Sequence, residues 1–178
     1  YKNVCIFCGS APGKEKIYEE KAVKLSKELA KRHLNLIYGA GNQGLMGIFA
    51  RTMIEQGSYV IGITPKHFEK INEKNPLKID EYHVVKDMHK RKAMMYEKSD
   101  AFIVFPGGIG TVDEMAEVLT WRQLGLHNKP VVIYNVNQYF ENFLIFLDQM
   151  RKKGFAKMSD YYCIAKTQDE IFDYLDNF

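Results

Sequence analysis

The stretch AFIVFPGGIGTVDEMAEVL, residues 101–119, changes character twice along its length. It begins as an unbroken apolar run, AFIVF, continues as the glycine-rich turn PGGIGT, and ends in VDEMAEVL, whose apolar residues have helical spacing. A short apolar run bounded by proline and glycine is typical of a buried strand. Glycines let bare backbone N–H groups approach a ligand, and the start of a helix carries a partial positive charge. The stretch therefore predicts a strand, an anion-binding turn and a helix.

Apolar runs of strand length recur along the chain, and helical patterns separate most of them. The runs are VCIFC (4–8), LNLIY (34–38), YVIGI (59–63), YHVV (82–85), AFIVF (101–105), VVIY (131–134) and CIA (163–165). Near-continuous apolar strands that alternate with amphipathic helices imply a parallel sheet covered on both faces. We therefore expect a doubly wound, Rossmann-like α/β fold with a mostly parallel sheet and helices on both faces. Residues 64–81, TPKHFEKINEKNPLKIDE, contain two prolines and little periodicity, and we expect a long loop there.

The composition is that of an ordinary globular protein. With 178 residues, 46% hydrophobic and 26% charged, the chain is expected to form one domain spanning 1–178. No apolar stretch approaches the roughly 20 residues of a membrane helix, and a net charge of +3 is too small to argue for nucleic acid. The first residues, YKNVCIFCGS, have the pattern of a strand and not of a signal peptide, which favours a cytoplasmic location.

The cysteines and histidines show no pattern of a metal or redox site. Cys5 and Cys8 form a CxxC inside a predicted strand, where residues three apart point to opposite faces. Together with Cys163 they are expected to be free thiols. The five histidines have no ligand spacing, and we expect neither a metal nor a cofactor.

Three predicted strands are followed by glycine-rich turns: CGSAPGK (8–14), YGAGNQGLMG (38–47) and PGGIGT (106–111). The carboxyl ends of parallel strands meet at one edge of a sheet, which is where ligands of such folds bind. Glycine turns beside helix N-termini there make an anion site, typically for phosphate. The candidate substrate-binding residues in these turns are Ser10, Gly39, Gly41, Gly44, Gly107, Gly108, Gly110 and Thr111.

Two nucleotide-binding motifs are disfavoured. GSAPGKE is one residue too short for a P-loop and lacks a Ser or Thr after the lysine. GAGNQG, residues 39–44, matches GxGxxG, but the next strand ends in GITP without the acid that would bind a ribose hydroxyl of NAD.

The helix predicted after PGGIGT has two stripes. Val112, Met115, Ala116 and Leu119 are expected to face the core, while Glu114, Glu117, Val118 and Trp121 form a second stripe at the same spacing. A solvated face rarely carries the only tryptophan of a chain, so this second face is expected to be covered. Glu114 then lies one turn inside a helix N-terminus, beside the anion site, with Glu117 next to it. Acids near a helix N-terminus also favour the helix dipole, which alone accounts for Asp113.

Arg91 is an arginine among methionines. In DMHKRKAMMYEK (87–98), a helical register places it with Met88, Met94 and Met95, followed by Lys92. The fixed fork of arginine suits a phosphate or a purine edge, and an arginine whose stem lies along a core margin is the alternative.

These motifs together resemble the LOG ("lonely guy") family of cytokinin riboside 5′-monophosphate phosphoribohydrolases. The stretches that carry the resemblance are CGS (8–10), YGAGNQGLMG (38–47), DMHKRKAMM (87–95), PGGIGTVDE (106–114) and TWRQLGLHNKP (120–130), which span nearly the whole chain. Departures from the pattern are Ala40, where the family commonly has glycine, and Asp113, where glutamate is frequent.

The resemblance implies an enzyme that hydrolyses the N-glycosidic bond of a purine nucleoside 5′-monophosphate, such as AMP or a cytokinin nucleotide, to free base and ribose 5-phosphate. It implies that Arg91 and Glu114 are essential, and that Gly107, Gly108, Gly110 and Thr111 bind phosphate. Met88, Lys92 and Glu117 are further expected around the substrate. The resemblance also implies a homodimer with the helix after PGGIGT near the interface.

Two other activities were weighed against this one. Relatives of the family carry a lysine decarboxylase label, but pyridoxal phosphate chemistry needs a Schiff-base lysine and an acid for the ring nitrogen, and no stretch indicates such a pair. A non-catalytic nucleotide or molybdenum-cofactor carrier is the stronger alternative, because glycine turns would serve a carrier equally well. The combination of Arg91 with Glu114 favours the enzyme.

Overall fold

The computed structural model describes residues 1–72, 76–156 and 161–178. Its strands form one parallel sheet in the order β4-β3-β2-β1-β5-β6-β7. The strands are β1 (Asn3–Phe7), β2 (Asn35–Tyr38), β3 (Val60–Pro65), β4 (Glu81–Val85), β5 (Ala101–Val104), β6 (Val131–Tyr134) and β7 (Cys163–Ala165). The helices are α1 (Lys16–Lys31), α2 (Gly44–Glu55), α3 (Lys66–Asn72), α4 (Met88–Lys98), α5 (Ile109–Gln123), α6 (Glu141–Lys152) and α7 (Gln168–Asn177), with a short 3-10 turn at Val136–Gln138.

The expected fold class is confirmed, and each apolar run from the sequence forms a strand of the sheet. The prediction of a loop over 64–81 is wrong at both ends, because Thr64 and Pro65 complete β3, α3 follows at once and Glu81 begins β4, but it is confirmed over 76–80, which form neither helix nor strand. A helix of 7 residues has too few turns to show an apolar period. Residues 73–75 of that predicted loop lie outside the described residues.

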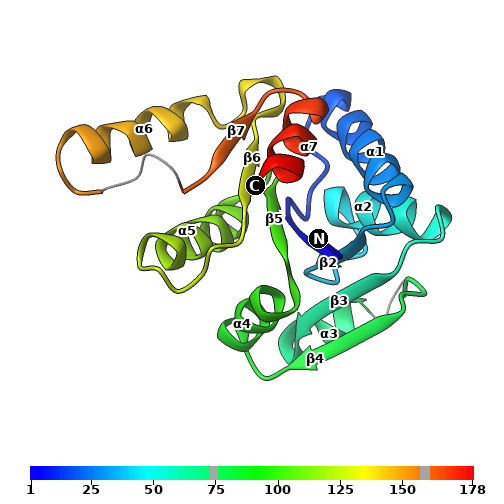
Figure 1. The fold of residues 1–178 in the computed structure, drawn as a ribbon. Helices are drawn as coiled ribbons and strands as arrows, with labels where there is room; N and C mark the ends of the chain where they lie inside the picture. The colour runs from blue at the N-terminus through cyan, green and yellow to red at the C-terminus, as the bar shows by residue number, and fades with distance from the viewer. Residues whose placement is uncertain (73–75, 157–160) are drawn as a thin grey trace.

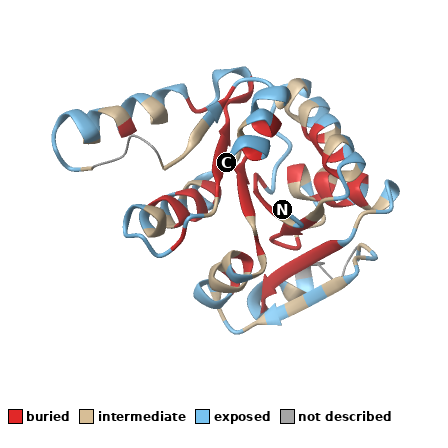
Figure 2. Ribbon diagram, in the orientation of Figure 1, coloured by how far each residue is buried: buried red, intermediate tan, exposed pale blue. Residues whose placement is uncertain are grey.

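Alternating strand residues build two cores, one on each face of the sheet. Val4 and Ile6 pack with buried residues of α1, α2 and α7, whereas Cys5 and Phe7 pack with α4, α5 and α6. Figure 1 shows α1 and α2 on one side of the strands and α4 and α5 on the other. In Figure 2 the central strands are buried throughout, while the edge strand β4 is only partly covered.

The strand order reverses between β1 and β5. β1 pairs with β2 on one side and with β5 on the other, and α1 and α5 leave these strands toward opposite faces. In open α/β sheets the crevice at such a reversal is where ligands bind. The turns after β1 and β5 are joined there, because Gly9 N–H donates to Pro106 O at 3.0 Å.

The buried face of α5 differs from the predicted one. Met115 and Leu119 are buried as expected, but Ala116 is exposed and Val118 is buried in the core. Trp121 packs against Tyr96 of α4, with ring centroids 4.9 Å apart. The second stripe is therefore covered in part within the chain, because α4 lies against it.

The three cysteines are free, as expected, and Cys5 and Cys8 are buried on opposite faces of the sheet. Among the described residues no helix is both long and apolar enough to span a membrane.

Candidate active site

A cavity of about 590 Å³ lies at the carboxyl edge of the sheet, at the reversal between β1 and β5. The turns after β1, β2 and β5 contribute to it, together with α3, α4 and the first turns of α5. Hydrogen bonds join these turns, since Met46 N–H at the start of α2 donates to Gly9 O at 3.2 Å. The lining residues are Cys8, Gly9, Ser10, Gly39, Gly41, Asn42, Gln43, Met46, Phe68, Met88, Arg91, Gly108, Ile109, Gly110, Thr111 and Glu114.

The N-terminus of α5 presents free backbone donors to this cavity. Its N-cap, Gly108, makes no side-chain cap, and the first backbone bond of the helix runs from Val112 N–H to Gly108 O at 3.2 Å. The N–H groups of Ile109, Gly110 and Thr111 precede that bond and have no helical acceptor. By contrast, α4 is capped by the side chain of Asp87, which accepts from Lys90 N–H at 2.9 Å. The α5 terminus thus has the geometry that suits an anion.

The glycines of the site differ in whether the surrounding structure leaves room for a side chain. A Cβ added at Gly39 would overlap the Arg91 guanidinium, and one at Gly107 would overlap Thr111, so packing requires both glycines. At Gly108 and Gly110 a Cβ would meet nothing within 4 Å, and neither adopts a positive φ. The fold does not need glycine at these two positions. Without a Cβ, both leave the backbone open to close approach of a ligand.

Ala40 adopts the left-handed conformation, with φ of 59°. Glycine accommodates that conformation without strain, whereas the Cβ of an alanine makes it less favourable. Ala40 does not line the cavity; it borders a separate hollow of about 200 Å³ between β2, α3 and β4.

Arg91 and Glu114 face each other in the cavity wall. Arg91 Nη2 lies 3.4 Å from Glu114 Oε1, and the two side chains are only 10% and 9% exposed. Arg91 Nη1 also donates to the sulfur of Met88 at 3.7 Å. Its Nε has no hydrogen-bond partner among the described residues. Arg91 as a residue lines the cavity, so its guanidinium can bond a substrate atom.

The environment of Glu114 favours its neutral form. Burial raises the pKa of this carboxyl to about 7, although Arg91 opposes the rise. The group is therefore poised to change charge near neutral pH, which is characteristic of catalytic carboxylates. Burial, and secondarily the Glu114 charge, raises the pKa of the Cys8 thiol well above its usual range, so Cys8 stays protonated and is a poor nucleophile.

The structure brings most of the predicted site residues together, but not all. Ser10, Gly39, Gly41, Met88, Arg91, Gly108, Gly110, Thr111 and Glu114 line the cavity, whereas Gly44, Gly107, Lys92 and Glu117 do not. Gly44 starts α2 with a φ of 57°, where a Cβ would overlap Ser10. Lys92 Nζ is held 2.9 Å from Glu117 Oε2 and 3.0 Å from Asp113 Oδ2, behind the cavity wall.

Several lining residues had no signal of their own in the sequence. Phe68 lies on α3, within the stretch predicted to be a loop, and Met46 has the position of an ordinary helix residue. Asn42 and Gln43 belong to the glycine-rich turn 38–47, and only their place in that turn connected them to the site.

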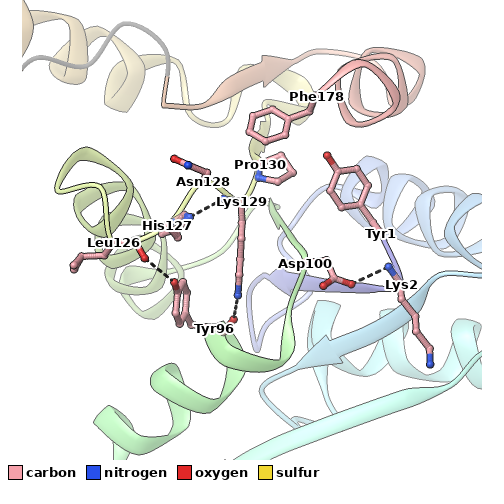
Figure 3. A pocket seen from close by; sticks show the side chains of 10 residues that line it. All are labelled: Tyr1, Lys2, Tyr96, Asp100, Leu126, His127, Asn128, Lys129, Pro130 and Phe178. Carbon is pink, nitrogen blue, oxygen red and sulfur yellow. Dashed lines mark hydrogen bonds between the residues drawn. The ribbon is translucent and has the colours of Figure 1, made fainter.

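A second hollow, of about 850 Å³, opens at the opposite edge of the sheet (Figure 3). Its charged side chains Lys129 and Asp100 make hydrogen bonds within the protein. Lys129 Nζ donates to Tyr96 O at 2.7 Å and lies 4.2 Å from the centre of the Tyr96 ring. Asp100 accepts from Lys2 N–H and Asn3 N–H, each at 2.8 Å. The hollow thus offers structural contacts and not a set of converging reactive groups.

Comparisons with known proteins show the family of the chain. Residues 46–177 match the family model described as "Possible lysine decarboxylase". The chain is 43% identical over 183 residues to "Probable cytokinin riboside 5′-monophosphate phosphoribohydrolase LOGL3" of Oryza sativa subsp. japonica, which covers 100% of this chain and 85% of that protein. It is 44% identical over 155 residues to "Cytokinin riboside 5′-monophosphate phosphoribohydrolase LOG3" of Arabidopsis thaliana, covering 87% and 72%.

A solved structure of similar fold is the Moco carrier protein from Chlamydomonas reinhardtii. It superposes with a TM-score of 0.72, covering 99% of this chain and 96% of its own, at 18% sequence identity. The molybdenum cofactor binding protein from Rippkaea orientalis superposes with a TM-score of 0.71, covering 99% of this chain and 97% of its own, at 19% sequence identity. At such identities the likeness establishes the fold alone.

Proposed function

This chain belongs to the family described as "Possible lysine decarboxylase", and since its relatives include named cytokinin riboside 5′-monophosphate phosphoribohydrolases, we propose that it is a phosphoribohydrolase of that kind. Water adds to C1′ of the nucleotide, the bond between C1′ and the base nitrogen breaks, and the base leaves with a proton. The products are free base and ribose 5-phosphate. The substrate is a purine nucleoside 5′-monophosphate.

The observation that carries this proposal is the position of Glu114. It lies in the same cavity wall as the uncapped N-terminus of α5, and it faces Arg91 at 3.4 Å. The N–H groups of Ile109, Gly110 and Thr111 bind the 5′-phosphate, which fixes the sugar in the cavity. Binding energy from the phosphate is thereby used to orient the reacting carbon.

Glu114 acts on the sugar in its ionised form. Departure of the base leaves positive charge on the ribose, as in other glycoside hydrolyses, and a nearby carboxylate stabilises that charge or orients the attacking water. Arg91 acts with Glu114 and not mainly on the phosphate, because its guanidinium is held against that carboxylate.

The other activities have less support. A decarboxylase using pyridoxal phosphate needs a lysine in the site, and no described residue lining the cavity is a lysine. A carrier role is supported by the fold-level likeness to molybdenum cofactor proteins, which share only 18–19% of the sequence. Neither activity explains a buried arginine paired with a buried glutamate beside an anion site.

We further infer a cytoplasmic homodimer. The free thiols of Cys5 and Cys8 suit a reducing compartment. Exposed apolar side chains near the end of α5 and on α6, Leu124, Leu126, Ile145 and Phe146, support a protein interface on that side of the molecule.

The direct test is an assay of product release. The protein is incubated with AMP and with N6-isopentenyl-AMP, and free base and ribose 5-phosphate are measured. We expect both products in equal amounts, and a loss of roughly 10²-fold or more in kcat for Glu114→Gln, with nucleotide affinity largely kept. The matched control is Glu97→Gln, which makes the same change at an exposed position of α4 and should leave the rate unchanged. Tight nucleotide binding with no release of base would instead support the carrier.

A further inference from the structure

A cluster of three charged side chains lies directly behind the Arg91–Glu114 pair. Lys92 of α4 makes ion pairs with two acids of α5, Glu117 at 2.9 Å and Asp113 at 3.0 Å. The Lys92 side chain is only 10% exposed, although its Asp113 partner is 55% exposed. Lysine is almost never this deeply covered unless it is paired. The cluster is therefore a built feature of the α4–α5 contact.

The cluster and the catalytic pair occupy adjacent sequence positions on the same two helices. Arg91 and Lys92 are neighbours on α4, and Asp113 and Glu114 are neighbours on α5. Three cross-helix ion pairs thus lie next to each other: Arg91–Glu114 in the cavity wall, and the two pairs of Lys92 outside the cavity lining. Because α4 contributes the cation and α5 the anion in each, the pairs of Lys92 fix the relative position of the helices that carry Arg91 and Glu114.

The outer cluster also controls the charge around Glu114. Asp113 and Glu117 are anions close to a buried carboxyl, and both act to disfavour its ionised form, whereas Arg91 and Lys92 favour it. From β1, the thiols of Cys5 and Cys8 also lie within electrostatic range. Without Lys92 two unpaired anions would flank Glu114, opposed mainly by Arg91.

We propose that Lys92 is a positioning residue for the reaction: by binding Asp113 and Glu117 it ties α4 to α5 and cancels the two negative charges that would otherwise keep Glu114 from ionising. Lys92 does not touch the cavity. It acts on the substrate only through Glu114. This inference rests on the proposed function for its effect on rate, but its effect on Glu114 is independent of any activity.

The test follows the titration of Glu114 directly. Protein labelled with ¹³C at glutamate side-chain carboxyls is titrated by NMR, and the Glu114 signal is assigned by its loss in Glu114→Gln. We expect Lys92→Met to move the Glu114 midpoint to higher pH by about one pH unit. Lys92→Arg keeps the charge and should restore the wild-type midpoint. Lys90→Met, at an exposed position of the same helix, is the matched control.

A second variant tests the same idea with the opposite sign. Glu117→Gln removes one of the flanking anions, so the Glu114 midpoint should fall and not rise. The pH profile of kcat/KM, measured on the same proteins with N6-isopentenyl-AMP, should shift its acid limb in parallel with each midpoint while KM stays nearly constant.

The outcomes separate this inference from the proposed function. A wild-type protein that releases no base, yet shows the opposite midpoint shifts, contradicts the proposed function and supports the role of Lys92. Hydrolysis with an unmoved Glu114 midpoint in both variants overturns the inference, as does a rate loss in Lys92→Met that is equal at every pH. In that last case Lys92 would only hold the helices together.

Discussion

Glu114 is the side chain on which the proposed reaction depends most. It is 8% exposed, and burial raises its pKa to about 7. A carboxylate that stabilises an oxocarbenium-like ribose must be ionised, so the protonated form of Glu114 is the inactive one. Activity should therefore depend on pH in the physiological range.

We expect kcat/KM for a nucleoside 5′-monophosphate to rise with pH along an acid limb centred near pH 7, since that parameter reports groups of the free enzyme. The sign follows from the raised pKa: below it the carboxyl is neutral and the rate falls about tenfold per pH unit. Initial rates between pH 5 and 9 measure this limb. A rate that is flat from pH 5.5 to 8 would show that ionisation of Glu114 does not control the reaction.

At the residue scale the sequence was informative about Arg91 and Glu114, because each stands out from its own helical stripe. It was less informative about Lys92 and Glu117, which were expected around the substrate. Whether a charged side chain enters the cavity or pairs behind its wall depends on how α4 and α5 are rotated against each other, and one helix alone does not reveal that rotation. Phe68 was missed because α3 is too short to show a period.

At the scale of elements, the first turn of α5 is the anion site, and its glycines distinguish binding from folding. Gly110 is exposed, helical and free of any neighbour that a Cβ would meet. Alanine fits that backbone, so the substitution should not harm the fold. Its methyl group, however, would occupy space beside the free N–H groups.

Gly110→Ala should raise the free energy of unfolding by up to about 1 kcal/mol and weaken nucleotide binding at least tenfold. Chemical denaturation and calorimetric titration with AMP measure the two effects. Ala116→Gly is the reciprocal control at an exposed position of the same helix, and it should lower stability by a similar amount without changing affinity. If Gly110→Ala bound AMP as tightly as the parent protein, the phosphate would not lie against this turn.

The strands were predicted more completely than the helix faces. A parallel sheet covered on both sides leaves an apolar run at each strand, and such runs are visible without knowledge of the tertiary structure. On α5 the second stripe was rightly expected to be covered, since Val118 is buried, but Ala116 of the stripe expected to face the core is exposed. Alanine has too little apolar surface to decide which face of a helix is buried. Burial of the larger valine stabilises the fold more, so Val118 faces the core.

At the scale of the whole molecule, α6 is covered less completely than a core helix would be. α6 extends away from the sheet (Figure 1), and only Leu147 is buried on it, while Ile145 and Phe146 are exposed. Leu124 and Leu126 after α5 are exposed as well, and exposed apolar side chains of this size are typical of protein interfaces.

The chain should accordingly be a dimer at micromolar concentration, with a mass by light scattering of twice 20.7 kDa. Replacing Leu126 by lysine should shift the population toward the monomer, while the same replacement at the exposed Tyr59, directly before β3, should not. A protein that stays monomeric at every concentration up to about 100 times micromolar would contradict the dimer. The expectation of one domain over 1–178 predicts a single cooperative unfolding transition for each subunit.

The central claim is that one buried carboxylate lies beside the ribose of a nucleotide whose phosphate is held by the start of α5. A crystal structure of Glu114→Gln bound to AMP tests it most directly. We expect the phosphate oxygens within hydrogen-bond distance of the N–H groups of residues 109–111, and the side chain of residue 114 in contact with the ribose near C1′. A phosphate bound elsewhere, with residue 114 facing away from the sugar, would contradict the claim.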